Sequence, residues 1–383
     1  MNSLVIENAI IAGSGVTSAD GWVLVEDGVI AAFGHGSVER TAFRTIDAHG
    51  GTVYPGFIDL HNHGAVGVDV NESDAESLLV VAEFLASRGV TAWLPTLVPD
   101  SDENYARVIG EIDRLIDLQN DKPVAQAVGV HYEGVFANEI MCGALRPQYF
   151  KRFTGTEIES LPRLKNGVHM TTLAPEIEGG VDLVSELTRQ GWIVSIGHSQ
   201  AEIDVLDAAF EAGGRHLTHF FNAMTGLHHR KVGLVGWALT NPEVTFDIIA
   251  DGIHVAERPL EFACRSKGPD KVSLISDSVA PTGLGDGEFE LWGEKVSVTD
   301  GRTKNERGSI AGSVITMLDA VNRMFSLGFT ADETARMASG NPSKLIGLER
   351  SMGSIKVGNR ADLVVLREDG EIAATIVGGV VAE

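Results

Sequence analysis

The sequence has few cysteines and no basic residue near its start. Only Cys142 and Cys264 occur among 383 residues, far apart in the chain. Two such thiols cannot form the disulfide framework of a small secreted domain, which favours a reducing compartment. No Lys or Arg precedes Arg40, so the first residues lack the basic region of a secretory signal peptide. No stretch approaches the roughly 18 uninterrupted apolar residues of a membrane span. We therefore expect a cytoplasmic protein.

Positive charge is scarce throughout. The chain has 30 Lys and Arg against 53 Asp and Glu, a formal net charge of −23. Nucleic acids and anionic membranes are bound through basic surfaces, so neither is expected as a partner. The 44 glycines include no Walker or Gly-x-Gly-x-x-Gly string between a strand and a helix, which excludes the usual nucleotide loops.

Apolar, β-rich runs alternate with helical segments through the middle of the chain, a pattern typical of βα units and a parallel sheet. We count eight runs, at 52–60, 90–98, 124–132, 168–173, 192–196, 216–220, 244–250 and 272–276. Eight strands close a (β/α)8 barrel. Helix starts are predicted by three strings of the capping-box type, at 73–76, 199–202 and 330–333.

Short Val- and Ile-rich strands are expected at both ends of the chain, at 4–11, 21–26, 29–33, 353–357, 363–366 and 372–381. We predict that they pair into a small β-sandwich domain made of residues 1–51 and 350–383. Residues 52–349 then form the barrel domain. The predicted fold class is α/β, a TIM-like barrel with a small β-sandwich built from both termini.

Potential metal ligands stand at the ends of the predicted strands, where barrels of this kind place their chemistry. They are His61, His63, Glu133, His198, His219 and Asp277. Imidazole and carboxylate suit zinc, iron, manganese or cobalt, and the lack of a thiolate among them argues against a structural zinc cage. A single His at a strand end is more often structural, but six such residues together predict a centre for one or two divalent ions, with zinc as the expected metal.

The spacing suggests roles for several of these residues. His61 and His63 lie two apart on an extended strand, so their side chains project to the same side and can hold one ion. Glu133 can bridge two ions. Asp277 can ligate an ion or accept a proton from water whose pKa a divalent ion lowers toward about 7.

Several strings resemble a known family. Residues 54–64, Tyr-Pro-Gly-Phe-Ile-Asp-Leu-His-Asn-His-Gly, resemble the first-strand motif of the amidohydrolase superfamily. Strings around Glu133, His198, His254 and Asp277, and above all His-Phe-Phe-Asn-Ala-Met at 219–224, resemble N-acetylglucosamine-6-phosphate deacetylases over nearly the whole chain. This resemblance implies metal-dependent hydrolysis of the N-acetyl group of N-acetylglucosamine 6-phosphate to glucosamine 6-phosphate and acetate, in amino-sugar catabolism.

The resemblance also implies residue roles. Glu133, His198 and His219 would hold the main ion, His61 and His63 a second one, and Asp277 would act as the general base that later returns its proton to the leaving nitrogen. General chemistry agrees, because an amine is a poor leaving group and needs a nearby acid.

A basic stretch at 228–231, His-His-Arg-Lys, is the candidate phosphate anchor, since Arg suits bidentate phosphate contact. The resemblance implies that Arg230 and His254 bind the phosphate, with Arg230 reaching across a homodimer interface. Backbone amides at Asn222 and Ala223 would add donors. The alternative interpretation of the basic stretch is a solvated loop.

Two positions depart from the family pattern. Val135 stands where the family usually has Pro, and Leu145 stands where many members have a His that polarises the acetyl carbonyl. Leu cannot donate a hydrogen bond, so polarisation has to come from metal or another group. Two alternatives therefore stay open: an amidohydrolase for another N-acyl amino sugar, such as N-acetylgalactosamine 6-phosphate, or a non-catalytic sugar-phosphate binding protein. Asp277 speaks against the latter, which needs no proton shuttle.

Overall fold

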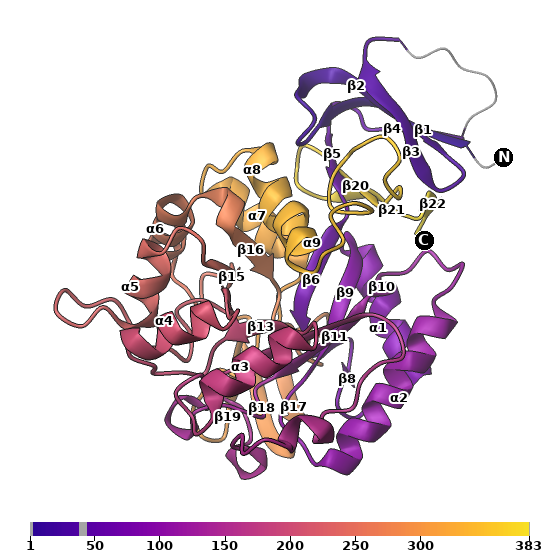
Figure 1. Cartoon of the computed structure of the whole chain (residues 1–383). Helices are drawn as coiled ribbons and strands as arrows, with labels where there is room; N and C mark the ends of the chain where they lie inside the picture. The colour runs from indigo at the N-terminus through magenta and orange to yellow at the C-terminus, as the bar shows by residue number, and fades with distance from the viewer. Residues whose placement is uncertain (1–2, 38–43, 383) are drawn as a thin grey trace.

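The computed structural model describes residues 3–37 and 44–382. Figure 1 shows a barrel surrounded by helices, with a separate sheet beside it that contains the first and the last strand of the described chain. None of the helices in the described ranges is both long and apolar enough to cross a membrane.

Eight parallel strands form the barrel, which confirms the predicted fold class. In order around the barrel they are β6 (Phe57–Asn62), β9 (Val90–Leu97), β11 (Gly129–Glu133), β12 (Val168–Leu173), β13 (Ile193–Ile196), β14 (His216–Leu217), β15 (Thr245–Ile249) and β16 (Val272–Ile275). A short strand, β10 (Gln126–Ala127), adds to β9.

The barrel closes between β16 and β6. The N–H of Asp277 donates to the carbonyl of His61 at 2.9 Å, and the N–H of His63 donates to Ser278 at 2.8 Å. Beneath them the buried Asp59 carboxylate accepts the Ser276 hydroxyl at 2.6 Å. This seam brings residues more than 200 positions apart in sequence into contact.

Helices cover the outside of the barrel. They are α1 (Ala75–Ser87), α2 (Asp102–Leu118), α3 (Gly180–Arg189), α4 (Ile203–Glu211), α5 (Gly233–Thr240), α6 (Glu257–Lys267), α7 (Met317–Ser326), α8 (Ala331–Ala335) and α9 (Asn341–Leu345). On α2 the buried side chains Tyr105, Val108, Ile112 and Leu115 recur at helical spacing. Burying each such side chain contributes about 1.5–3 kcal/mol, which fixes the helix against the strands.

The predicted helix starts fare differently. At α8 both hydrogen bonds of the capping box are present between Thr330 and Glu333. At α1 the cap is Asp74, one residue later than the predicted Ser73. At α4 the predicted cap is wrong, because the Ser199 hydroxyl donates to a carboxylate on another loop and the helix begins without a side-chain cap.

The strands of the two termini pair in one mixed sheet. Its strands are β22 (Val380–Val381), β21 (Ile372–Val377), β20 (Leu363–Leu366), β5 (Thr52–Pro55), β1 (Ser3–Ile11), β2 (Val16–Glu26) and β3 (Val29–His35), with β4 (Arg44–Asp47) also paired to β1. Val-, Ile- and Leu-rich faces of these strands enclose a second apolar core. The predicted pairing of the two ends is therefore confirmed, and the division of the chain into domains at residues 52 and 350 stays a prediction.

The first predicted run is not a single barrel strand. Its first half, β5, pairs antiparallel with β20 in the terminal sheet, and only its second half enters the barrel as β6. Gly56 separates the two halves, and a Cβ at this position would lie 2.1 Å from the Thr91 hydroxyl oxygen. Only glycine fits where the chain passes from one sheet to the other.

Two small antiparallel sheets complete the structure. One pairs β7 (Gly64–Ala65) with β8 (Val68–Asp69), directly after β6. The other consists of β17 (Gly287–Leu291), β18 (Glu294–Thr299) and β19 (Arg302–Asn305), inserted between β16 and α7. The sequence patterns did not predict this insertion.

Candidate metal centre

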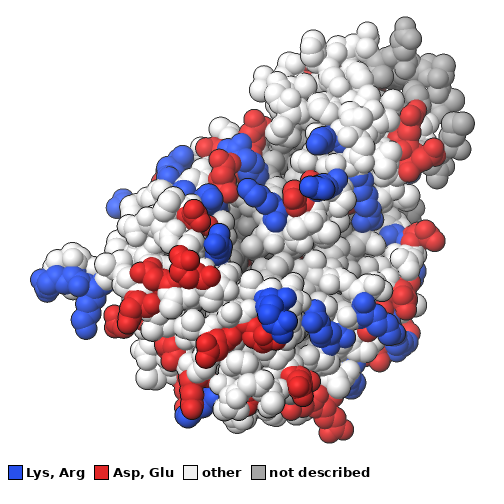
Figure 2. Space-filling view, viewed as in Figure 1, with Lys and Arg blue, Asp and Glu red and all other residues white. Residues whose placement is uncertain are grey.

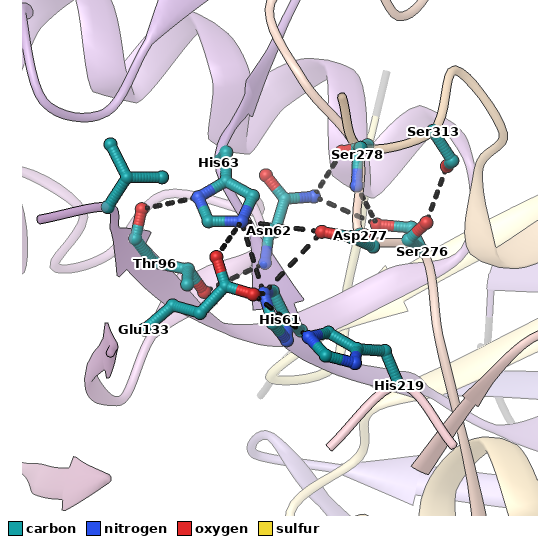
Figure 3. Close-up of polar contacts among 12 residues, drawn as sticks. His61, Asn62, His63, Thr96, Glu133, His219, Ser276, Asp277, Ser278 and Ser313 are labelled. Carbon is teal, nitrogen blue, oxygen red and sulfur yellow. Dashed lines mark hydrogen bonds and ion pairs between the residues drawn. The ribbon is translucent and has the colours of Figure 1, made fainter. Parts of the chain in front are cut away.

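All six predicted ligands converge at the carboxyl ends of the barrel strands, and each is at least nine-tenths buried. Figure 3 shows the Glu133 carboxylate directed toward His61, near the end of β6, toward His63, which directly follows β6, and toward His219. Two groups of ligand atoms lie within 4.8 Å of one another: His61, His63 and Glu133, and Glu133, His198 and His219. Glu133 belongs to both groups, as expected for a bridging carboxylate.

The distances within the centre are short. Oε1 of Glu133 lies 3.1 Å from Nε2 of both His198 and His219, and 3.4 Å from Nε2 of His61. Its Oε2 lies 3.3 Å from Nε2 of His63. Oδ1 of Asp277 lies 3.3 Å from His63 and 3.5 Å from His61. Asp277 therefore faces the same ligand atoms as Glu133.

The ring orientations fit a bound cation. Nδ1 of His63 donates to the Thr96 carbonyl at 3.1 Å, and Nδ1 of His198 donates to the Met141 carbonyl at 2.8 Å. A carbonyl only accepts, so in the neutral rings Nε2 carries a lone pair that faces the Glu133 carboxylate. Such an arrangement is stable only with a proton or a metal ion between the two, which is the donor set of a divalent metal site.

Three site residues have a left-handed backbone, with φ of 48° at His198, 32° at His219 and 51° at Asp277. Phe221 and Ala223, in the string that follows β14, share this conformation. Each such residue costs on the order of 1–3 kcal/mol and persists only where its surroundings hold it, as at functional sites. The geometry of the strand ends is therefore imposed by the fold.

The carboxylates of the centre shift the pKa of its histidines in the metal-free chain. Burial lowers the pKa of His63, but hydrogen bonds to Asp277 and Glu133 outweigh it and raise this pKa to about 10. Burial raises the pKa of Glu133 and of Asp277, but the neighbouring histidines lower both below their usual values. The metal-free centre therefore holds a proton on His63 at neutral pH.

Metal affinity is expected to rise with pH. An ion that binds His63 has to displace its proton, so the apparent affinity should increase about tenfold per pH unit for each proton released, as long as the pH stays below the folded pKa of about 10. Titration of the metal-free protein against a competing chelator between about pH 6 and pH 8 measures this slope. An affinity independent of pH would contradict the assignment of His63 as a ligand.

A pocket of about 280 Å³ opens onto the centre and is lined by four ligands, Asp277, and the predicted substrate residues Asn222, Ala223 and His254. Nδ1 of His254 lies 2.7 Å from Oδ2 of Asp251. Burial raises the pKa of Asp251, but its hydrogen bond to His254 and the charge of that ring lower it below the usual value. The structure thus brings the predicted substrate residues Asn222, Ala223 and His254 to one pocket with four of the predicted metal ligands and Asp277.

Arg230 is the exception. It lies in segment 226–232, which is exposed throughout and leads into α5. This segment projects from the body of the molecule, at the left of Figure 1, and Figure 2 shows Lys and Arg side chains gathered at its tip. Arg230 is absent from the described residues that line the pocket of its own chain.

The two departures from the family pattern are both buried. Leu145 lines the pocket and packs with Val98 and Ala137. Val135 is fully buried in the main core. Neither side chain offers a hydrogen bond to a substrate carbonyl.

Sequence reasoning missed the pocket residues Trp292, Ser309 and Ile310. Trp292 lies at the turn between β17 and β18, its indole N–H donates to Asp69 at 2.9 Å, and its ring centroid lies 5.5 Å from that of His63. No local signal marks these residues, because the inserted sheet folds back over the barrel from a distant part of the chain.

Residues 52–382 match the amidohydrolase family. The chain is 33% identical to N-acetylgalactosamine-6-phosphate deacetylase of Escherichia coli O157:H7, over 91% of this chain and 92% of that protein. It is 30% identical to N-acetylglucosamine-6-phosphate deacetylase of Bacillus subtilis, over 99% and 97%. The structure of N-acetylglucosamine-6-phosphate deacetylase from Pasteurella multocida superposes with a TM-score of 0.91 at 29% identity, covering 99% of each chain.

A mutant of N-acetyl-D-glucosamine-6-phosphate deacetylase from Mycobacterium smegmatis, solved in complex with N-acetyl-D-glucosamine-6-phosphate, superposes with a TM-score of 0.90 at 28% identity, covering 100% of this chain and 99% of that one. The similarity therefore extends over both the barrel and the terminal sheet.

Proposed function

The chain belongs to the amidohydrolase family and, within it, to the N-acetylglucosamine-6-phosphate deacetylase family, and on this premise we propose that it hydrolyses N-acetylglucosamine 6-phosphate to glucosamine 6-phosphate and acetate. The observation that carries the proposal is the sharing of Glu133 between two His-containing groups, with Asp277 facing the same ligand atoms. Amino-sugar catabolism in the cytoplasm is the expected setting.

We assign Glu133, His198 and His219 to the main ion and His61, His63 and Glu133 to a second one, with zinc as the expected metal. Iron, manganese and cobalt share the same ligand preferences. A divalent ion at such a centre supplies a Lewis acid that polarises a carbonyl and lowers the pKa of water toward about 7.

Asp277 is the proposed proton carrier. Its Oδ1 faces His61 and His63, and the lowered pKa of its carboxyl keeps it ionised at neutral pH. It can therefore accept a proton from the attacking water and later donate it to the amide nitrogen, so that an amine rather than an amide anion leaves. Leu145 offers no hydrogen bond to the acetyl group, so a divalent ion held by these ligands would have to supply the polarisation of the carbonyl.

The sugar phosphate is bound, in this proposal, by His254 and by groups of the 219–224 string. The N–H of Asn222 already donates to the His219 carbonyl at 2.9 Å, whereas the N–H of Ala223 has no acceptor among the described residues. The Asn222 side-chain amide also donates to the His219 carbonyl, at 3.2 Å, so the Ala223 N–H is the available donor of this pair of residues. Arg230 would come from the second copy in a homodimer, because its segment projects away from the pocket of its own chain.

A second substrate is favoured by one observation. The E. coli relative at 33% identity is named an N-acetylgalactosamine-6-phosphate deacetylase. Together with Leu145 at the pocket wall, it makes N-acetylgalactosamine 6-phosphate the alternative sugar.

Acetate release from a matched panel tests the proposal. The panel contains N-acetylglucosamine and N-acetylgalactosamine, each with and without a 6-phosphate, and the protein is assayed after chelation and again after metal is restored. We expect activity only with metal and only on phosphorylated sugars. The specificity constant for the preferred epimer should exceed that for the other by at least about tenfold, a difference of roughly 1.4 kcal/mol in transition-state binding. Equal rates on plain and phosphorylated sugars would refute the roles of Arg230 and His254, and absence of acetate from every sugar would favour a binding protein.

A further inference from the structure

A buried carboxylate contacts the backbone of one predicted metal ligand. Asp247, on β15, is fully buried and accepts hydrogen bonds from the neighbouring strand end. Its Oδ1 accepts the backbone N–H of His219 in a short contact, and its Oδ2 lies 3.1 Å from Nε2 of His216. The Thr218 hydroxyl also reaches it, at the longer distance of 3.4 Å.

His219 is held differently from the other three histidines of the centre. Nδ1 of His61, His63 and His198 each has a hydrogen-bond partner, whereas Nδ1 of His219 is buried and has none among the described residues. No hydrogen bond to Nδ1 therefore orients the His219 ring. What fixes the residue is its backbone, held at a φ of 32° while its N–H points to Asp247.

Thr218 extends the same support to the other ligand group. Its single hydroxyl proton donates to Asp247, so its oxygen has to accept the hydrogen bond at 3.1 Å from Nδ1 of His61. This contact leaves the lone pair of His61 on Nε2, the atom that faces Glu133. Asp247 thus supports one ligand of each group, His219 directly and His61 through Thr218.

We propose that Asp247 is the positioning residue that joins the two halves of the metal centre, holding His219 by its backbone and His61 by its ring. The inference rests on the metal centre of the proposed function. His216, for which the sequence suggested no role, donates to the second oxygen of Asp247 and has its own Nδ1 at 2.8 Å from the Thr245 hydroxyl. His216 therefore holds the Asp247 carboxylate through its second oxygen, opposite the oxygen that accepts the His219 N–H.

Metal affinity of the variants tests the proposal without reference to turnover. In Asp247→Asn the amide has one oxygen for three donors, so at least one contact is lost. We expect the affinities of both ligand groups to fall about 10–100-fold, the usual cost of removing a partner of a metal ligand. Titration of the metal-free protein with Co²⁺, followed by the visible absorption of bound cobalt, measures both affinities, and the band shape at saturation reports ligand geometry.

Two further variants separate positioning from simple loss of stability. Thr218→Val removes only the link to His61, so it should weaken the His61, His63 and Glu133 group and leave the other within about twofold. Asp362→Asn changes a buried carboxylate that directly precedes β20 and accepts the Gly378 N–H at 2.8 Å, with no contact to either ligand group, and should leave both affinities unchanged. If Asp247→Asn does not fold, Thr218→Val decides alone.

Wild-type affinities in folded Asp247→Asn, or in Thr218→Val, would overturn the positioning role and leave the proposed function intact. A wild-type protein that binds no Co²⁺ would overturn both. Selective weakening in Thr218→Val, with loss at both groups in Asp247→Asn, is the pattern the proposal requires.

Discussion

Replacing Glu133 with glutamine is expected to weaken both ligand groups at once. The Glu133 carboxylate has one oxygen 3.1 Å from Nε2 of His198 and His219 and the other 3.3 Å from Nε2 of His63. A glutamine amide has a single oxygen and no charge. It can therefore coordinate an ion in at most one of the two ligand groups, and it binds that ion more weakly than a carboxylate does. Metal affinity should fall by about 100-fold or more, which exceeds the decrease expected when only a hydrogen-bond partner of a ligand is removed. Acetate release should be abolished.

Elemental analysis of the purified variant, with and without added metal, measures the loss. Glu111→Gln is the matched control, because Glu111 lies on α2 outside the barrel, where it accepts the Ala75 N–H at 3.0 Å and pairs with Arg114 at 2.7 Å. This control should retain its metal. A Glu133→Gln protein with the wild-type metal content would show that the shared carboxylate is not a ligand.

Replacing Asp277 with asparagine should have the largest effect on turnover at constant metal content. Asparagine tolerates the left-handed φ of 51° at this position, so the backbone at the barrel seam should be preserved. The amide cannot accept and return a proton, and loss of a general acid–base group costs about 10²–10⁴-fold in rate. Glu133 and the four histidines remain to hold metal, so metal content should stay near that of the wild type.

Steady-state rates and metal analysis on the same preparation separate the two effects. Asp207→Asn, which changes a carboxylate that accepts the Trp237 indole N–H on the outside of the barrel, is the control for the amide substitution and should keep the wild-type rate. Wild-type turnover in Asp277→Asn would exclude a proton-carrying role. Loss of metal together with activity would instead make Asp277 mainly a ligand.

Most of the ligand set could be predicted because it depends on local order along the chain. Glu133 ends β11, and His61 lies near the end of β6. The carboxyl ends of parallel strands necessarily meet at one end of a closed barrel, so once eight strands were predicted, the convergence of these residues followed. The spacing of His61 and His63 similarly predicted that both would face one site.

Other features depend on contacts between distant segments, which local patterns do not encode. The run at 52–60 reads as one strand, yet its first half pairs with β20, more than 300 residues later. The inserted sheet carries Trp292 to within 5.5 Å of His63, between ring centroids. The exposed segment of Arg230 has the composition of a phosphate site, but its place outside the pocket is visible only in the folded chain.

The sequence by itself determined the family, the barrel and the chemical type of each ligand, because strand periodicity and residue identity are local properties. Only the tertiary structure decided that Glu133 lies in both groups of potential ligands, that the His219 N–H donates to Asp247, and that Thr218 lies between Asp247 and His61. Each of these features is a short contact between residues that belong to different strands. They are set by how the barrel closes and packs, and no segment of the sequence carries that information alone.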